Sequence, residues 1–368
     1  MGRSVPWSVS RQAKNVRVTL SVLVVLAVVL ELAAGAGMAY VAGFALVRAV
    51  LGQFDWVWLP VLCGSLAVAF AGYYYAYRGI FRVGGGPRLT RTQGLAVVAA
   101  GFGGFLAHAG GNLDKYALEA AGLDEVDART RVLALAGLEY GVLSIGGTVT
   151  AIVMLFAGAH VPLSFTVPWA VIPVPGFLAG FWAAERYRDR IRPGPGWRGL
   201  PGSVVESVYL ISILFTRPRR WGYAWLGMAL FWAMEAVTVW AGLAAFGYPM
   251  NGADLFVGFA TGTVFTRRTG PLAGAGVLTV VLPAAIWACG APFAVAVAGV
   301  FAYRVLAFWL PMPLSLAALP TLRAMNAATY HREKSPLLTS RPLTGAAPSR
   351  ALAPLTGPCG PGAPYALI

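Results

Sequence analysis

Long apolar runs recur along almost the whole chain, and they constrain its fold more than any other feature. A helix needs about 20 apolar residues to cross the hydrocarbon of a bilayer, and such runs recur from Val18 to near Leu319. Of the 368 residues, 58% are hydrophobic and only 11% are charged, which is too apolar for an ordinary soluble domain. The sequence therefore predicts an all-α polytopic membrane protein without a soluble catalytic domain.

The charged residues lie in short basic clusters between the apolar runs. The chain has 28 Lys and Arg against 14 Asp and Glu, a bias typical of cytoplasmic loops under the positive-inside rule. Nucleic-acid binding would need these charges on a solvated face beside stacking aromatic residues, so we expect no nucleic-acid partner. The three cysteines are far apart and form no CxxC motif, so neither a metal site nor another cofactor is indicated.

Three regions follow from composition. Residues 1–17 are basic and are expected to be cytoplasmic, residues 18–322 form the membrane domain, and residues 323–368, rich in Pro, Gly, Ser and Thr, are expected to be a disordered cytoplasmic tail. We expect a multi-pass protein of the cell (inner) membrane with both termini in the cytoplasm. A cleaved signal peptide is the alternative for the first apolar run, but that run continues to Val50, which favours an uncleaved span.

The apolar runs predict about six full spans and two Gly-rich re-entrant hairpins. If residues 92–111 crossed the membrane fully, the arginine cluster at 186–198 would lie outside, against the positive-inside rule; a hairpin that enters and returns places it inside. Residues 255–290 are the second hairpin, and residues 203–215 are expected to be an amphipathic interfacial segment. The six spans are 18–40, 56–77, 133–159, 166–184, 221–246 and 292–319.

The two halves of the chain, about 18–185 and 203–322, resemble each other weakly. Each has a Gly-Phe pair, a Gly-rich break and then a polar pair, which is Glu139-Tyr140 in the first half and Tyr303-Arg304 in the second. Interrupted apolar segments at corresponding places indicate a transporter built from inverted repeats. Close packing of Gly-rich helices is the alternative explanation.

Charged residues inside apolar runs are the strongest candidates for a site. Arg267 and Arg268 lie between two apolar runs, and a charge at bilayer depth costs about 2.5 to 3.5 kcal/mol on insertion scales. They either bind a ligand or cap a short helix at the interface. For Glu31 and Glu235, each alone in an apolar run, we favour a structural, hydrogen-bonded role over proton transfer.

These motifs resemble the transmembrane region of the lysylphosphatidylglycerol synthase family, whose members are flippase-like membrane proteins. The resemblance spans roughly residues 20–325. It is carried by AGFGGFLAHAGGNLDKYALEAAG and RVLALAGLEYGVL in the first half, and by TRRTGPLAGAGVLTVVLPAAIWACG and FAYRVLAFWLP in the second. Thr279 or a neighbour stands where the family often has an acid. Nothing foldable follows Met325, so the aminoacyl-transferase activity of bifunctional members is not expected.

The resemblance implies movement of a phospholipid or polyprenyl-linked lipid with an anionic or modified headgroup between leaflets. The arginines would bind its phosphate. The acids would balance the charge of the arginines or hold a cationic group of the headgroup, and the tyrosines would supply hydrogen bonds at the rim of the cavity. The candidate headgroup-binding residues are Arg267, Arg268, Arg304, Tyr303, Asp114, Lys115, Glu139 and Tyr140. The candidate hinge or cavity glycines are Gly103, Gly104, Gly110, Gly111, Gly270, Gly274 and Gly276.

Two other functional classes stay open. His108 and Asp114 are six residues apart and suit acid-base chemistry, but no Ser-His-Asp order or HExxH motif accompanies them, so an enzyme is not expected. A lipid-binding scaffold or accessory subunit of a cell-envelope glycosyltransferase or lipid-modifying enzyme is the main alternative. The expected partners are a membrane lipid and either a second copy of the chain or an envelope-biosynthesis enzyme. No phosphate-binding loop is present, so the chain itself does not couple ATP hydrolysis.

Overall fold

The computed structural model describes residues 25–26, 28–86, 89–103, 114–115, 117–119, 121–157, 162–264 and 276–311, and the single residues 313, 321 and 324. The chain divides into a compact unit, Met1–Thr329, and a second unit, Tyr330–Ile368. The second unit lies outside the described residues, as does the basic segment 1–17.

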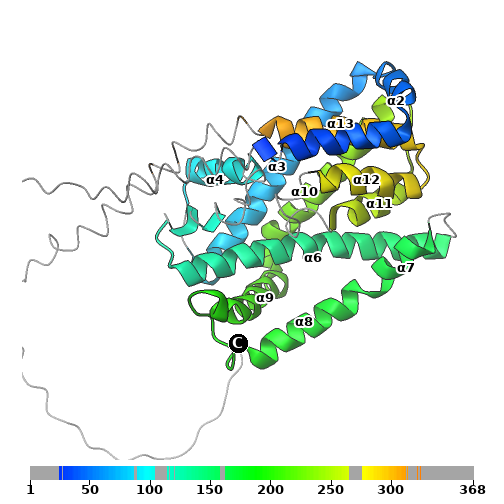
Figure 1. Ribbon diagram of the computed structural model, residues 1–368. Coiled ribbons are helices and arrows are strands. Elements are labelled where there is room, and N and C mark those ends of the chain that lie inside the picture. The colour runs from blue at the N-terminus through cyan, green and yellow to red at the C-terminus, as the bar shows by residue number, and fades with distance from the viewer. Residues whose placement is uncertain are drawn as a thin grey trace, which may run out of the picture. The chain divides into compact units, whose positions relative to one another are not determined.

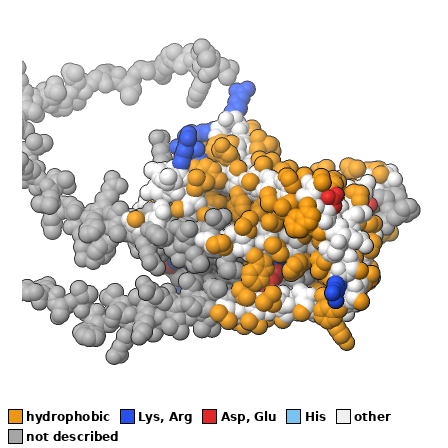
Figure 2. Space-filling view, turned by 90° about the horizontal axis from the view of Figure 1, so that it is seen from above, with side chains coloured by type: hydrophobic (Ala, Val, Ile, Leu, Met, Phe, Trp, Pro, Cys, Tyr) orange, Lys and Arg blue, Asp and Glu red, His pale blue; other side chains and the backbone are white. Residues whose placement is uncertain are grey.

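The described residues form helices and connections, with no strand among them. Within the described part of the chain, five helical segments are long and apolar enough to cross a membrane: Trp56–Gly85, Glu125–Ala157, Leu163–Tyr187, Trp197–Thr216 and Pro218–Ala245. The outward side chains are correspondingly apolar, and Figure 2 shows a face on which charged groups are few. The labelled helices in Figure 1 are α2 (Phe44–Leu51), α3 (Leu59–Arg82), α4 (Arg91–Gly103), α6 (Glu125–Ala157), α7 (Leu163–Val171), α8 (Pro173–Tyr187), α9 (Leu200–Thr216), α10 (Pro218–Ala245), α11 (Gly252–Val264), α12 (Val277–Ala288) and α13 (Phe293–Arg304).

The first apolar run, which continues to Val50, is bent just beyond the span expected at 18–40. The helix Val28–Ala42 and α2 meet at an angle of 103°. Gly43 lies between them with φ +87°, a left-handed conformation that glycine adopts readily and other residues rarely do. The bend directs α2 away from the axis of the preceding helix.

Two further segments differ from expectation. Residues 203–215, expected to lie at the interface, belong to a helix that begins at Trp197 and meets the length and hydropathy of a span. The described residues of the run 292–319 form α13 and then a π-helix, Val305–Trp309. π-Helices arise mostly as single turns and are frequent at functional sites.

The antiparallel pair α3 and α10 forms the centre of the bundle. Gly72 of α3 and Gly227 of α10 face each other so closely that a Cβ on either would lie 2.6 Å from the carbonyl oxygen of the other. Ser65 and Thr238 share a hydroxyl–hydroxyl hydrogen bond of 2.8 Å. Small residues of this kind let the backbones of membrane helices approach and pack closely.

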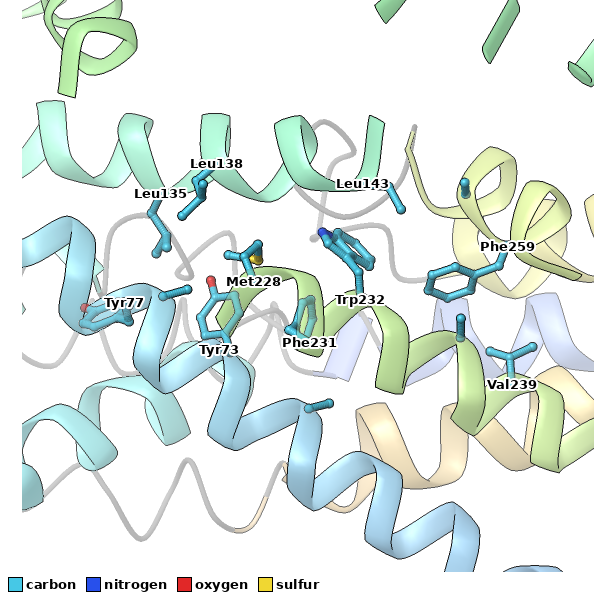
Figure 3. Packing of buried hydrophobic residues seen from close by; sticks show 14 of the residues in the cluster. Tyr73, Tyr77, Leu135, Leu138, Leu143, Met228, Phe231, Trp232, Val239 and Phe259 are labelled. Atoms are coloured by element: carbon cyan, nitrogen blue, oxygen red, sulfur yellow. The ribbon is translucent and has the colours of Figure 1, made fainter. Parts of the chain in front are cut away.

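Helix α6 packs its buried leucines against this centre. Leu135, Leu138 and Leu143 lie toward α10, where Met228 and Trp232 are buried in the same cluster (Figure 3). The indole N–H of Trp232 also donates to the backbone carbonyl of Glu139 on α6, at 2.7 Å. Figure 1 shows α8 and α9 on one side of α6, with α11, α12 and α13 on the other.

One end of the bundle is joined by Arg131, and we call it the Arg131 end. The guanidinium of Arg131, near the start of α6, donates to the carbonyl oxygens of Ile80, Phe81 and Val83 at the end of α3, at 2.7 to 3.1 Å. The last carbonyls of a helix generally need partners from outside it. The end of α3 and the start of α6 therefore lie together, and α10 begins there because Ala224 packs on Gly79.

The opposite end is joined by Asp55, and we call it the Asp55 end. The backbone N–H of Asp55, just before α3, donates to the carbonyl of Ala245 at the end of α10, at 2.8 Å. The Tyr248 hydroxyl, just after α10, donates to the carbonyl of Gly290, just before α13, at 2.9 Å. The end of α10 and the start of α13 thus lie at the Asp55 end.

Helices α11 and α12 form an antiparallel hairpin. A Cβ on Gly258 would contact Ala285 and Cys289, and a Cβ on Gly262 would contact Leu282, so the contact positions run in opposite directions along the two helices. The hairpin leaves from the Asp55 end after α10 and returns to it before α13. Its two helices have 13 and 12 residues.

Candidate functional site

A buried ion pair between Glu31 and Arg304 is the most concentrated polar feature of the described structure. Glu31 is 4% exposed and Arg304 is 7% exposed. The guanidinium donates from Nε to Oε1 at 2.7 Å and from Nη2 to Oε2 at 2.9 Å. This two-pronged geometry is the strongest form of arginine–carboxylate pairing.

Helix α12 completes the shell around Glu31. The hydroxyl of Thr279 donates to Oε1, and the backbone N–H of Gly276 donates to Oε2 at 2.8 Å. Gly276 has φ +78°, and a Cβ there would lie 3.0 Å from the carbonyl oxygen of Leu30. Glycine is therefore needed at this position, because both the backbone conformation and the close approach exclude a side chain.

Arg304 owes its position to the end of α13. It is the last residue of that helix, and the π-helix follows immediately. Its guanidinium carbon lies 4.4 Å from the centre of the Phe308 ring, which holds the cation from one side. With a rise of about 1.5 Å per residue, Arg304 lies about 16 Å along α13 from Phe293, roughly half the thickness of a bilayer's hydrocarbon.

A cavity of about 330 Å³ adjoins this ion pair. Pockets that hold small molecules begin at about this size. The cavity lies between the Val28–Ala42 helix, α2 and α13, and its lining is apolar except for four residues: Glu31, Thr279, Arg304 and Arg48. Leu32, Phe44 and Phe301 also line it and are largely exposed, so the cavity opens to the apolar outside of the protein.

Arg48 gives the cavity a second cation. It lies on α2, beyond the 103° bend, and it is exposed. Val47 and Val50 of α2 pack with Phe246 at the end of α10, so Arg48 is at the Asp55 end. The cavity thus reaches from the buried Glu31–Arg304 ion pair to an exposed arginine at the Asp55 end.

The structure separates the residues that the sequence suggested for a single site. Arg304 and Gly276 bind Glu31, whereas the Tyr303 hydroxyl donates to Glu235 of α10. Asp114 is buried, and the Tyr77 hydroxyl is 3.3 Å from its carboxylate. Residue Lys115 is paired with Glu125 at 2.9 Å and with Glu119 at 3.6 Å.

The remaining candidates lie on α6, at the end of α4 or outside the described residues. Glu139 is fully buried and Tyr140 is half-buried on α6, and Gly103 is the last residue of α4. Those outside the described residues are Arg267, Arg268, Gly104, Gly110, Gly111, Gly270 and Gly274.

Three residues of the site were not among the sequence candidates. Glu31 is visible in the sequence as a lone acid in an apolar run, and the expectation of a buried, hydrogen-bonded group is correct; its partner, 273 positions away, is not readable from the sequence. Thr279 contributes its hydroxyl to the Glu31 carboxylate. Nothing in the sequence distinguishes Arg48 from the chain's other arginines.

A second two-pronged ion pair lies outside the cavity. Arg188, just after α8, donates to Glu206 of α9 at 3.0 and 3.2 Å, and its guanidinium lies 3.4 Å from the centre of the Tyr209 ring. The hydrogen bonds to Glu206 raise the pKa of the Arg188 guanidinium above its ordinary value. This pair reproduces the chemistry of Glu31 and Arg304 at a partly exposed position.

Among the described residues, no cluster of three His, Cys, Asp or Glu side chains is suited to hold a metal ion. No family model matches the chain, and no curated protein matches it significantly. The chemistry of the site is therefore argued from its own residues.

Proposed function

We propose that this protein is a flippase-like transporter that moves a lipid with an anionic headgroup between the leaflets of its membrane. The observation that carries the proposal is the apolar cavity that opens outward and has a two-pronged Glu31–Arg304 ion pair in its wall. Ionisable residues inside membrane segments are rare and commonly line substrate or ion paths. The apolar lining suits an acyl or prenyl chain, and the arginines suit a phosphate.

The course of the chain supports two re-entrant hairpins. The segment between α3 and α6 starts and ends at the Arg131 end, since Arg131 joins those two helix ends. The segment between α10 and α13 starts and ends at the Asp55 end. Each helix of the second hairpin is about 20 Å long at most, shorter than the hydrocarbon thickness of about 30 Å. The two hairpins thus enter from opposite sides.

The contact between α3 and α10 supports an inverted repeat. A Cβ on Gly72 would contact the carbonyl oxygen of the facing glycine, the side chain three residues after that glycine and the backbone nitrogen four residues after it, on α10. A Cβ on Gly227 would contact the same three groups, at the same spacing, on α3. These reciprocal contacts are those of two helices related by a local two-fold axis. Transporters of this type bind substrate at the repeat interface near the midplane, the depth at which Arg304 lies.

In this proposal α9 lies at the membrane interface, although it is long enough to be a span. Its first turn is joined to the Arg131 end, because Arg129 of α6 donates to the Ser203 hydroxyl at 2.9 Å. The following helix, α10, also begins at that end. A helix that starts and ends on one side lies along the membrane surface. The arginines at 217, 219 and 220 then lie at that surface, which the positive-inside rule identifies as cytoplasmic.

The test is leaflet exchange of labelled lipids in liposomes that contain the purified protein. The Glu31→Gln, Arg304→Gln double variant removes both charges without leaving one of them buried alone, which would be costly. We expect wild-type protein to exchange anionic phospholipid and the double variant to lose at least tenfold of that rate. The matched control is Arg188→Gln, Glu206→Gln, which removes the same kind of ion pair outside the cavity and is expected to retain the wild-type rate.

The outcomes separate the proposal from its main rival. Loss of exchange in both double variants would mean that any buried or half-buried pair is needed for folding, and the site assignment would fail. A folded wild-type protein that binds anionic lipid at Arg304 and exchanges none would be a lipid-binding scaffold or accessory subunit instead. The Arg267→Ala, Arg268→Ala variant tests the two adjacent arginines that the sequence suggests as headgroup-binding residues.

A further inference from the structure

The Glu31 carboxylate already occupies the edge of Arg304 that an anionic headgroup would use. Both carboxylate oxygens are engaged, and each receives one hydrogen bond from Arg304 and one from α12. The Nε and Nη2 groups form the fork that best matches two oxygens of a carboxylate or a phosphate. A phosphate that binds this fork must therefore displace Glu31.

A displaced Glu31 would have little to stabilise its charge. Among the described residues, α12 offers it only the Thr279 hydroxyl and the Gly276 N–H. The charged groups that line the cavity with it are Arg304 of α13 and Arg48 of α2, and Arg48 is exposed to solvent. Tyr303 is bonded to Glu235, and Arg304 would be held by the phosphate. A carboxylate in apolar surroundings without a cation becomes neutral by binding a proton.

The balance of buried charges also favours protonation of Glu31 when a phosphodiester binds. The buried wall of the cavity carries one negative charge, on Glu31, and one positive charge, on Arg304, because Arg48 is exposed and its charge is solvated. A phosphodiester brings one negative charge into this low-dielectric space. If Glu31 takes up one proton as the phosphodiester binds, the net charge of the occupied cavity stays what it was when empty, and no uncompensated charge is buried.

We propose that binding of an anionic phosphodiester lipid at Arg304 is coupled to protonation of Glu31. This inference rests on the proposed function and adds its energy coupling. The phosphate replaces the carboxylate on the guanidinium fork, and a proton from water forms an O–H bond on Glu31. The reverse exchange releases the lipid and the proton together, so a transmembrane proton gradient can drive lipid movement in one direction.

The sign of the pH dependence follows directly. In the empty site Arg304 holds Glu31 in its ionised form, and in the occupied site the proton is favoured. Lipid affinity therefore rises as the pH falls, by up to about tenfold per pH unit when one proton is taken up per lipid. The slope disappears below the pH at which Glu31 is already protonated in the empty site.

The experiment measures binding of short-chain phosphatidylglycerol to the full chain in detergent between about pH 5 and pH 8, a range over which a phosphodiester keeps its single charge. Calorimetry in two buffers with different ionisation enthalpies gives the protons taken up per lipid bound. We expect wild-type uptake to approach one proton. We expect Glu31→Gln, which imitates the protonated acid, to bind at least as tightly as wild type at pH 8 and to show neither slope nor proton uptake.

Two controls and two contrary results complete the design. Glu206→Gln, at the ion pair outside the cavity, is expected to keep the wild-type slope, and short-chain phosphatidylcholine is expected to bind more weakly than phosphatidylglycerol. Binding of phosphatidylglycerol by wild type without proton uptake would overturn the coupling and leave the lipid site standing, since the anion would then use the other edge of Arg304. No binding of either lipid at any pH would overturn the lipid site itself. The wild-type measurement decides between these results even if Glu31→Gln does not fold.

Discussion

The contact of Gly72 with Gly227 gives the sharpest test of the packing. In Gly72→Ala the new Cβ would lie 2.6 Å from the carbonyl oxygen of Gly227 and 2.9 Å from the backbone nitrogen of Phe231, where ordinary contacts begin at 3.4 Å. Neither backbone atom can rotate away, so α3 and α10 must separate by several tenths of an ångström along their most closely packed stretch. Overpacking of this kind costs about 1 to 3 kcal/mol.

Gly64 is the matched control, because it lies two helical turns earlier on α3 and a Cβ added there would have no other atom within 4 Å. Replacing either glycine by alanine gains the same helix propensity, up to about 1 kcal/mol. The difference in unfolding free energy between the two variants therefore isolates the steric cost, and we expect Gly72→Ala to be less stable than Gly64→Ala by about 1 to 3 kcal/mol.

The assay is reversible unfolding of the purified protein in mixed micelles, titrated with a denaturing detergent and followed by circular dichroism. Equal unfolding free energies for Gly72→Ala and Gly64→Ala would refute the close approach of the two helices. They would also remove the reciprocal contact on which the inverted repeat is argued. Leaflet exchange by Gly72→Ala in liposomes then shows whether this contact must stay fixed during transport.

Three further substitutions test other contacts by the same unfolding measurement. Arg131→Met leaves three carbonyls at the end of α3 without their donor and should cost about 3 kcal/mol or more, with faster amide exchange at the Arg131 end; unchanged stability would contradict that role. Ser65→Ala removes the hydrogen bond to Thr238 and should cost only about 0.6 kcal/mol, the usual value between membrane helices. Arg188→Gln breaks the partly exposed pair with Glu206 and should cost less than about 1 kcal/mol; a loss as large as that of Arg131→Met would show that the pair is buried in the membrane.

The positions of the long helices could be predicted from apolar run length alone. The run expected at 221–246 is α10, Pro218–Ala245, because a segment in lipid must satisfy its backbone hydrogen bonds internally and a helix does so. The run expected at 133–159 is α6, which begins earlier, at Glu125. The acidic residues Glu125 and Asp127 lie in its first turn, where they favour a helix start; apolar content alone does not register them.

What the sequence determined by itself was thus the class of protein and its helical segments, since hydropathy acts along the chain over about 20 residues at a time. It also showed that Glu31 and Arg304 are costly charges in apolar runs. Only the tertiary structure decided that they are partners, because they are 273 positions apart and a two-pronged ion pair depends on how the Val28–Ala42 helix packs beside the end of α13. The cavity is likewise a property of three packed elements, and no single stretch of sequence contains it.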